Sequence, residues 1–288
     1  MEGGAVTLHF YANISRLKSF WQNQIKSVAL VTVEGETMTA ETSDTLCAEL
    51  YELLAHDVDL STIHVSEESI DLLVRHLELV IEKNKVMNLT RITNEHEALS
   101  LHIIDSLLFI AHEPTLLNSQ SSLLDIGTGA GYPGMPLSIV TGCHATLIDS
   151  VRKKVSAVQS FVGELNLSDR ITCVHARAEE VPSLCDSRFD VVVARAVAQT
   201  NVLIEYATPC LRKNGTLLVG KGNPTDDELD TANRAARICG LENSGHFEYE
   251  LPSGLGHRTI LVFTKTGNPR IKLPRQIGMA KRMPLGIE

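Results

Sequence analysis

A cluster of glycines follows an apolar run in the middle of the chain and carries the clearest sign of chemistry. The run at residues 123–126 leads into Gly127, Gly129 and Gly131. Glycine adopts positive φ freely and has no Cβ, so such a loop can turn sharply and bring its backbone close to a ligand. A methyl group there would block that approach. The pattern therefore predicts a nucleotide-type cofactor bound against this loop.

Two classes of cofactor are compatible with the loop. Gly129 to Gly134 match G-x-G-x-x-G, and Asp149 lies 20 residues after Gly129, where a dinucleotide fold places its ribose-binding carboxylate. Asp125 completes the pattern D-x-G-x-G-x-G, which resembles motif I of class I S-adenosylmethionine methyltransferases. A carboxylate would repel a pyrophosphate, whereas S-adenosylmethionine has no phosphate and carries an ammonium and a sulfonium. S-adenosylmethionine is therefore favoured. An NAD-dependent oxidoreductase and a cofactor-free RNA-binding module stay as alternatives.

The segments around the loop alternate between short apolar runs and amphipathic stretches. Strands are predicted at residues 123–126, 145–149, 171–175, 189–194, 215–219, 245–251 and 258–265, and helices at 134–140, 152–165, 201–211 and 226–238. This order predicts an α/β fold with a mostly parallel seven-stranded sheet and an antiparallel edge. It resembles the Rossmann-like fold of class I methyltransferases. No residues remain for the second domain that a dehydrogenase needs.

The chain divides into four predicted segments. Residues 1–44 show little periodicity and form an N-terminal extension that is a candidate for disorder, and Met38 within it is a candidate for the true start. Residues 45–115 are predicted to form a helical cap, in which Ser66 and Asn94 suit the N-caps of two helices. Residues 116–266 hold the Rossmann-like sheet, and residues 267–288 form a basic C-terminal tail.

Composition and charge limit the class of protein. The chain has 288 residues, 43% of them hydrophobic, which suits a globular protein with a substantial core. Its six cysteines include no Cys-x-x-Cys pair, so reduced structural thiols are favoured over disulfides or zinc. A net charge of −9 argues against extensive nucleic-acid contact, whereas the basic tail suits a local RNA contact or a solvated segment. The apolar run at residues 28–33 is too short to span a bilayer, so we expect a cytoplasmic protein.

The loops after the strands carry the other candidate cofactor residues, because a ligand of an open α/β sheet lies across the carboxyl ends of its strands. Asp149 can accept both ribose hydroxyls, or it can cap the helix that follows. The backbone of Ala178 and Glu179 would reach the adenine edge. Lys153 suits either a substrate phosphate or a solvated helix face. Arg195 follows the fourth strand, where an ion pair with Glu179 is the structural alternative.

A series of ordered motifs narrows the superfamily. The motifs are Asn88-Leu-Thr90, His102-Ile-Ile-Asp105-Ser106, Asp125 to Leu137, Ala194-Arg195-Ala196, Gly220-Lys221-Gly222 and the ending Ala280 to Leu285. Together they resemble the bacterial small-subunit ribosomal RNA guanine-N7 methyltransferases, also called glucose-inhibited division protein B. The resemblance runs from about residue 46 to residue 285, and nothing in it explains residues 1–45.

The resemblance implies methyl transfer from S-adenosylmethionine to N7 of one guanosine in 16S ribosomal RNA. It implies a monomeric enzyme whose partner is that RNA or a small-subunit assembly intermediate. Guanine N7 has a lone pair and no proton to lose, so no catalytic acid or base is expected. A methyltransferase for another RNA or a small molecule is the alternative. The implied cofactor residues include Gly127, Tyr132, Ala178, Glu179 and Arg195, and the implied RNA side includes Asn88, His102, Asp105, Lys153 and Lys221.

His102 and Asp105 lie three residues apart and would share one face of an α-helix. They either form a buried, hydrogen-bonded pair that braces the cap or help to orient the guanine. Lys221 and Arg258 lie near strand ends, where they suit RNA phosphate contacts or ordinary surface charge.

Overall fold

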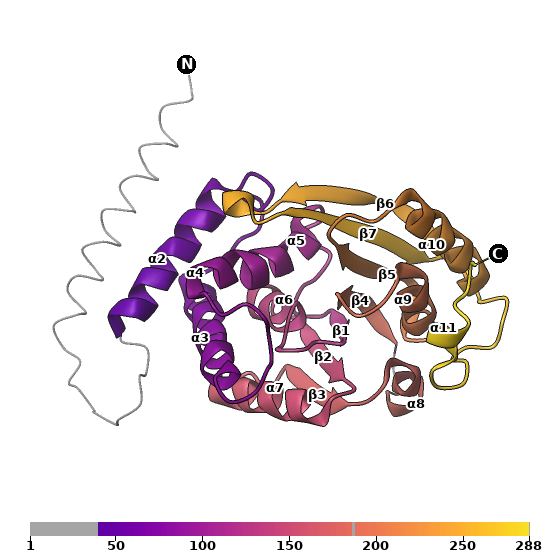
Figure 1. Ribbon diagram of the computed structural model, residues 1–288, viewed down its shortest axis with the longest axis horizontal. Helices are drawn as coiled ribbons and strands as arrows, with labels where there is room; N and C mark the ends of the chain where they lie inside the picture. The colour runs from indigo at the N-terminus through magenta and orange to yellow at the C-terminus, as the bar shows by residue number, and fades with distance from the viewer. Residues whose placement is uncertain (1–39, 186–187, 288) are drawn as a thin grey trace, which may run out of the picture. The chain divides into compact units, whose positions relative to one another are not determined.

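The computed structural model describes residues 40–185 and 188–287, which form a central sheet with helices on both faces (Figure 1). The strands of this part of the chain are β1 Ser122–Ile126, β2 His144–Asp149, β3 Ile171–His175, β4 Phe189–Arg195, β5 Leu211–Lys221, β6 Leu241–Glu250 and β7 His257–Lys265. Their order across the sheet is β3-β2-β1-β4-β5-β7-β6. The predicted α/β class I methyltransferase fold is therefore confirmed, including its seven-stranded sheet.

The sheet is parallel except at one edge. Strands β1 to β5 pair in parallel, whereas β7 pairs antiparallel with both β5 and β6. The chain order reverses between β1 and β4, which lie side by side. In an open α/β sheet a ligand is expected outside the carboxyl ends of the strands at such a reversal. The glycine loop follows β1, and Arg195 ends β4. The fold therefore places both at the carboxyl edge of the parallel strands.

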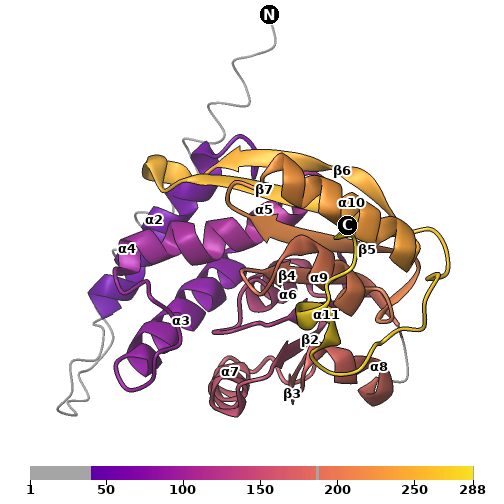
Figure 2. The ribbon, with the colours of Figure 1, turned by 45° about the vertical axis from the view of Figure 1, so that its right-hand side comes forward.

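Helices cover both faces of the sheet (Figure 2). Helices α6 Gly134–Thr141 and α7 Arg152–Glu164 pack against β2 on one face. Helices α9 Thr200–Ala207 and α10 Asp226–Cys239 pack together on the other, against β5 and β6. The core on that side joins strand side chains such as Val192 to small residues of α10, including the fully buried Ala235. Because both faces are covered, the inner strands are apolar at nearly every position.

The N-terminal helices lie on the face of α6 and α7, and their predicted N-caps are confirmed. Helix α2 spans Ala40–His56 and α3 spans Glu67–Asn84, and α3 contacts α2, α6 and α7. The side chain of Ser66 caps α3 by accepting the Ser69 N–H at 3.1 Å. Asn94 caps α4, Glu95–Ala98, in the same way by accepting the Glu97 N–H at 2.9 Å.

The sequence predicts one continuous α-helix after Asn94, but the structure shows a different course. A π-helical segment, Leu99–Ile104, follows α4 and leads into α5, Asp105–Ala111. Such segments occur mostly as short insertions and often at functional sites. Here the insertion lies in the stretch that carries His102, and it changes which side chains share a face.

Two element boundaries differ from the predictions around residue 209. The predicted helix 201–211 ends at Ala207, and residues 208–210 form a turn. Pro209 has no N–H to continue the helix, which explains the early end. Strand β5 then begins at Leu211, which pairs with Phe189 ahead of a register shift.

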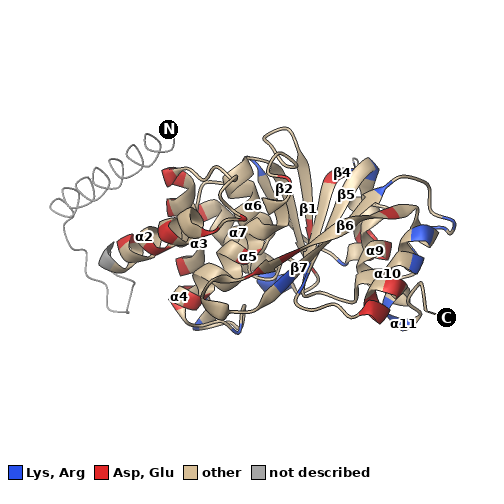
Figure 3. Ribbon diagram, turned by 90° about the horizontal axis from the view of Figure 1, so that it is seen from above, with Lys and Arg blue, Asp and Glu red and all other residues tan. Residues whose placement is uncertain are grey.

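The C-terminal segment 267–287 packs on the α9 and α10 face. The Arg275 Nε donates to Glu205 Oε1 of α9 at 2.8 Å, and the Asn201 amide donates to the Leu285 carbonyl at 2.7 Å. Ala280, in α11 Met279–Arg282, is 1% exposed. The solvated-tail interpretation is therefore wrong, and the local RNA contact stays a prediction. Lys and Arg gather around this segment, whereas acidic residues lie along α2 at the other end (Figure 3). The exposed cations are Arg270, Lys272, Lys281 and Arg282.

The structure also bears on the predictions for the N-terminal extension, the cysteines and membrane-spanning segments. Residues 1–39, with the candidate start Met38, lie outside the described residues, and α2 already includes residues 40–44. All six cysteines are described, and none forms a disulfide. None of the described helices is long and apolar enough to cross a membrane.

Candidate active site

The three loop glycines all have positive φ, but they face different surroundings. A Cβ on Gly127 (φ +75°) would lie 2.5 Å from Val197, and one on Gly131 (φ +101°) would lie 2.7 Å from Met135. A Cβ on Gly129 (φ +62°) would meet no atom closer than 4.0 Å. Packing within the protein therefore already favours glycine at positions 127 and 131, whatever binds to the loop. Of the three loop glycines, only Gly129 opens onto unfilled space.

Asp125, on β1, holds the far end of the glycine loop in place. It is 0% exposed, and its Oδ2 accepts the Gly134 N–H at the start of α6 at 2.9 Å. Its Oδ1 has no hydrogen-bond partner among the described residues. Burial raises the pKa of Asp125 to about 6, against the lowering effects of Thr128, the Gly134 N–H and Arg195. Asp125 therefore fixes the junction between β1 and α6.

Asp149 ties β2 to the loop. Its Oδ2 accepts the Gly129 N–H at 3.2 Å and its Oδ1 accepts the Val151 N–H at 2.8 Å. The N-cap of α7 is Val151, which makes no side-chain cap bond, so the helix-capping interpretation of Asp149 is wrong. Each carboxylate oxygen accepts more than one hydrogen bond. Asp149 can therefore hold Gly129 in place and still accept ribose hydroxyls.

Ala178 and Glu179 lie in a 3₁₀ turn, Ala178–Glu180, after β3. Ala178 is buried, and the Glu179 side chain points to the C-terminal segment, where its Oε1 accepts the Gly278 N–H at 2.9 Å. The predicted ion pair between Glu179 and Arg195 does not form, because each side chain has other partners. The backbone of this turn stays the predicted adenine contact.

Tyr132, at the end of the loop, lies between two histidine rings. The His102 ring stacks on it at 4.4 Å with an interplanar angle of 6°, and the His76 ring lies 4.6 Å away on a tilt of 34°. The Arg195 guanidinium lies 5.7 Å from the Tyr132 ring centroid. Tyr132 is 4% exposed, its hydroxyl has no partner among the described residues, and burial raises its pKa. The ring thus joins the cofactor loop to the helical cap.

Sequence analysis missed His76, which positions the loop. His76 lies on α3, is fully buried, and its Nε2 donates to the Ala130 carbonyl at 3.0 Å. A carbonyl only accepts, so Nε2 carries a proton. Burial lowers the pKa of His76 to about 4. The sequence does show a histidine among the apolar residues on the buried face of α3, and this pattern could have indicated the residue.

This buried histidine predicts a pH dependence of stability. The folded pKa of about 4 lies below the ordinary 6.5, so between these values the unfolded chain binds more protons. The stabilisation from neutral His76 is therefore complete above about pH 6.5 and is lost as the pH falls toward 4. In urea unfolding, His76→Asn is expected to be less stable than the wild type at pH 7 and closer to it at low pH. Exposed His144→Asn is the control, and a gap for His76→Asn that does not change with pH would contradict the account.

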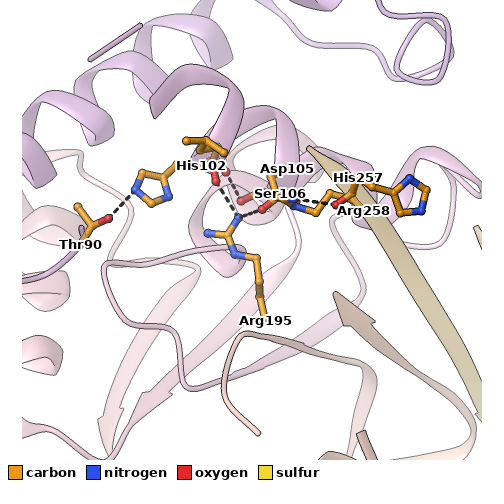
Figure 4. Close-up of polar contacts among 8 residues, drawn as sticks. Thr90, His102, Asp105, Ser106, Arg195, His257 and Arg258 are labelled. Atoms are coloured by element: carbon orange, nitrogen blue, oxygen red, sulfur yellow. Dashed lines mark hydrogen bonds and ion pairs between the residues drawn. The ribbon is translucent and has the colours of Figure 1, made fainter. Parts of the chain in front are cut away.

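Asp105 binds two arginines from distant strands (Figure 4). The Arg195 Nη1 donates to Asp105 Oδ2 at 2.7 Å, and the Arg258 Nε donates to Asp105 Oδ1 at 2.9 Å. The Asp105 side chain is 6% exposed, and those of Arg195 and Arg258 are 15% and 21% exposed. Two guanidinium groups share one carboxylate through charge-assisted hydrogen bonds, so the cluster carries one net positive charge.

His102 and Asp105 do not bind each other, so the predicted hydrogen-bonded pair is wrong. His102 instead contacts the Thr90 hydroxyl through Nε2 at 3.0 Å. Residues three apart share a face of an α-helix, but the wider turn of the π-helical segment moves them to different faces. Burial, followed by Arg195 and His76, lowers the pKa of His102 to about 3. Its ring is therefore neutral where it stacks on Tyr132.

Several of these side chains line a cavity of about 390 Å³. Lys221 lies in its wall and is already paired, because its Nζ lies 2.6 Å from Glu228 Oε1. Asn88 and Lys153 are exposed and lie outside this lining. The cavity therefore brings together four of the six predicted RNA-side residues. Its polar lining consists of His102, Asp105, Arg195, Lys221 and Arg258.

Known proteins are similar to this chain in sequence. The model of one family, described as rRNA small subunit methyltransferase G, matches residues 69–250. The ribosomal RNA small subunit methyltransferase G of Carboxydothermus hydrogenoformans is 37% identical over 77% of this chain and 94% of its own length. The chain belongs to this family. A second relative of the same name, from Alkaliphilus oremlandii, is 34% identical over 82% of this chain and 99% of its own length. The family recognised from the motifs is thereby confirmed, and membership makes the chain a methyltransferase.

A solved structure aligns with part of this chain. The fibrillarin pre-rRNA processing protein of Methanococcus jannaschii aligns with a TM-score of 0.44 at 17% identity, over 52% of this chain and 69% of that protein. The family assignment rests on the sequence relatives.

Proposed function

We propose that the chain transfers a methyl group from S-adenosylmethionine to N7 of a guanosine in small-subunit ribosomal RNA. The observation that carries the proposal is the position of Arg195. Its guanidinium lies 5.7 Å from the ring centroid of Tyr132, on the cofactor loop, and it donates to Asp105 in the wall of the cavity. A cofactor on the loop and a base in the cavity would therefore meet at this side chain.

The loop suits S-adenosylmethionine. Space is open in front of Gly129, and Asp149 beside it keeps acceptor capacity for ribose hydroxyls. The turn at Ala178 offers backbone groups to an adenine edge. Gly127, Gly131 and Tyr132 would support the ligand mainly by shaping the loop. When bound, the cofactor supplies an electrophilic methyl on a sulfonium, and the buried charge of Asp125 favours that positive group over a pyrophosphate.

Binding measurements distinguish this cofactor from NAD. In isothermal titration the full chain is expected to bind S-adenosylhomocysteine and to bind NAD far more weakly. The reason is the carboxylate of Asp125 beneath the loop, which repels a pyrophosphate. Tight binding of NAD without binding of S-adenosylhomocysteine would overturn the cofactor assignment.

The cavity suits a guanine base. Guanine presents N7 and O6 as acceptors on one edge, and arginine is its commonest partner. Asp105 holds Arg195 and Arg258 in place. If their N–H groups donate to O6 of the guanine, N7 keeps its lone pair free to attack the methyl group. The attack needs alignment rather than a base, because N7 has no proton to lose. Asn88, Lys153, Lys221 and the basic C-terminal segment stay as proposed contacts to the RNA backbone.

His102 is proposed to position the base by its neutral ring. His102→Ala is expected to lower the methylation rate by about 10- to 100-fold, since misplaced reactants lose that much. The affinity for S-adenosylhomocysteine should stay within a few-fold, because His102 touches Tyr132 and Thr90 rather than Asp149. Turnover, titration and thermal melting are measured together. A variant that unfolds, with both functions lost together, would support a purely structural role.

The transfer itself is tested with purified protein, tritiated S-adenosylmethionine and small-subunit RNA. Nuclease digestion and chromatography are expected to place the label in 7-methylguanosine. Label in another nucleoside, or no transfer to this RNA, would overturn the proposal. The substrate is further inferred to be 16S RNA or a small-subunit assembly intermediate. One chain carries both the loop and the cavity, so we infer a monomer, and action on ribosomal RNA implies the cytoplasm.

A further inference from the structure

The segment that follows β4, residues 196–199, contacts both the glycine loop and the cavity. Ala196 lines the cavity together with Arg195. The next residue, Val197, packs so closely against Gly127 of the glycine loop that a Cβ on Gly127 would lie 2.5 Å from it. The segment is therefore in contact with both places where the reactants of the proposed transfer would bind.

Ala196 has a backbone conformation that is costly for its residue type. Its φ is +56°, in the left-handed region that alanine rarely adopts. Ala196 is exposed, so packing of its methyl group does not offset this cost. Backbone strain of this kind persists only where the surrounding structure enforces it, and it clusters at functional sites. The other described non-glycine residues with positive φ do not line the cavity; they are Asn166, Asn214 and Ser253.

Hydrogen bonds to the residues after Ala196 support its conformation. Glu228, in the first turn of α10, accepts the Thr200 N–H at 3.2 Å and the Thr200 hydroxyl at 2.7 Å through its Oε1. The Lys221 Nζ lies 2.6 Å from the same oxygen and donates to the Ala198 carbonyl at 3.2 Å. Thr200 is 0% exposed, so water does not replace these partners. Strand β5 and helix α10 thus hold the chain at two points after Ala196.

The φ of Ala196 sets the direction in which the chain leaves β4. Arg195 ends that strand, and its side chain extends to Asp105 (Figure 4). The left-handed turn directly after Arg195 brings Val197 to Gly127 and Ala198 to Lys221. A different φ would direct these residues elsewhere and would change the wall between the glycine loop and the cavity.

We propose that Ala196, through its left-handed backbone, and Glu228 are positioning residues for methyl transfer. They hold residues 196–199 as a fixed wall that sets the base against the cofactor, and neither residue needs to touch a reacting atom. The inference rests on the proposed function, because it assumes that base and cofactor meet at this wall. Alignment matters most for a transfer that needs no acid or base, and a displacement of about 1 Å can cost about 100-fold in rate.

Ala196→Gly separates positioning from stability. Glycine adopts this φ without strain, so the variant is expected to melt at or slightly above the wild-type temperature. Glycine also adopts other conformations, so single-turnover methylation of small-subunit RNA should fall about 10-fold. Affinity for S-adenosylhomocysteine should stay within about 3-fold, because the proposed contacts at Gly129 and Asp149 lie on other elements.

Asn166→Gly is the matched control. Asn166 also has φ +56°, is exposed and lies between α7 and β3, outside the lining of the cavity. This variant should methylate at the wild-type rate. An equal loss of rate in both glycine variants would overturn the inference, as would an Ala196→Gly protein that methylates as fast as the wild type.

A double-mutant cycle tests whether Glu228 acts through the same segment. Glu228→Ala should lower the methylation rate by a similar factor and the melting temperature as well, because Thr200 loses its partner. In the double variant with Ala196→Gly the two rate losses should overlap, whereas losses that multiply would contradict a shared role. A wild type that places no label in 7-methylguanosine would overturn the proposed function and the inference with it. A wild type that does so beside an unaffected Ala196→Gly protein would contradict the inference alone.

Discussion

Asp105→Ala is expected to lower methyl transfer by at least about 100-fold and the free energy of unfolding by about 3–5 kcal/mol. The carboxylate is 6% exposed and is the shared partner of Arg195 and Arg258. Its removal leaves two guanidinium groups close together with no counter-charge, and the cost of such an uncompensated buried charge is large. The arginines would move apart, and the donors that face the base would lose their positions. Methyl transfer per folded molecule and urea unfolding are the measurements.

A second buried ion pair offers a matched control for this variant. Glu205, whose side chain is 3% exposed, pairs with Arg275 on the opposite face of the sheet, away from the cavity. Glu205→Ala should lose stability on a similar scale, while methyl transfer by its folded fraction falls far less than in Asp105→Ala, because only the docking of the C-terminal segment is changed. If folded Asp105→Ala also methylates at the wild-type rate, the paired arginines do not position the substrate.

Gly129→Ala is expected to weaken the binding of S-adenosylhomocysteine by about 100-fold or more, equivalent to about 2.7 kcal/mol. The added methyl would occupy the open space beside Asp149, which we assign to the cofactor. It meets no protein atom within ordinary contact distance, so the loss of stability should be only the backbone strain of about 1–2 kcal/mol. Titration and thermal unfolding of the same preparation provide the two numbers.

Gly142→Ala controls for that strain. Gly142 ends α6 with φ +74°, close to the φ +62° of Gly129, and its added Cβ would lie 3.6 Å from Ser119 in ordinary contact. The two variants should lose similar stability, but only Gly129→Ala should lose the ligand. Equal affinity for S-adenosylhomocysteine in both variants would mean that the cofactor does not pass over Gly129.

Local patterns were sufficient to predict most of the fold. Apolar runs separated by amphipathic stretches predicted the inner strands to within a few residues, because both faces of the sheet are covered there. The edge strand β6 is mostly exposed, and its predicted start at residue 245 lies after its observed start at Leu241. Ser66 and Asn94 were recognisable as N-caps, since a cap involves residues only three apart. The glycine loop was equally visible, because the chain must turn there whatever binds.

The site's long-range contacts were not predictable from such patterns. Arg258 reaches Asp105 across 153 positions, and His76 reaches Ala130 across 54. Only the folded chain brings these groups together, so Asp105 was assigned to His102, its neighbour in sequence. The π-helical turn and the docking of the C-terminal segment depend in the same way on tertiary packing. Composition described that segment as basic but could not show that Arg275 is bound to Glu205.

Mapping 7-methylguanosine in 16S ribosomal RNA from cells with and without the gene tests the central claim most directly. We expect one guanosine to lose its N7 methyl group when the gene is deleted. The wild-type gene should restore the methyl group, and Gly129→Ala should fail to restore it. A 7-methylguanosine pattern that is the same in both strains would contradict the assignment.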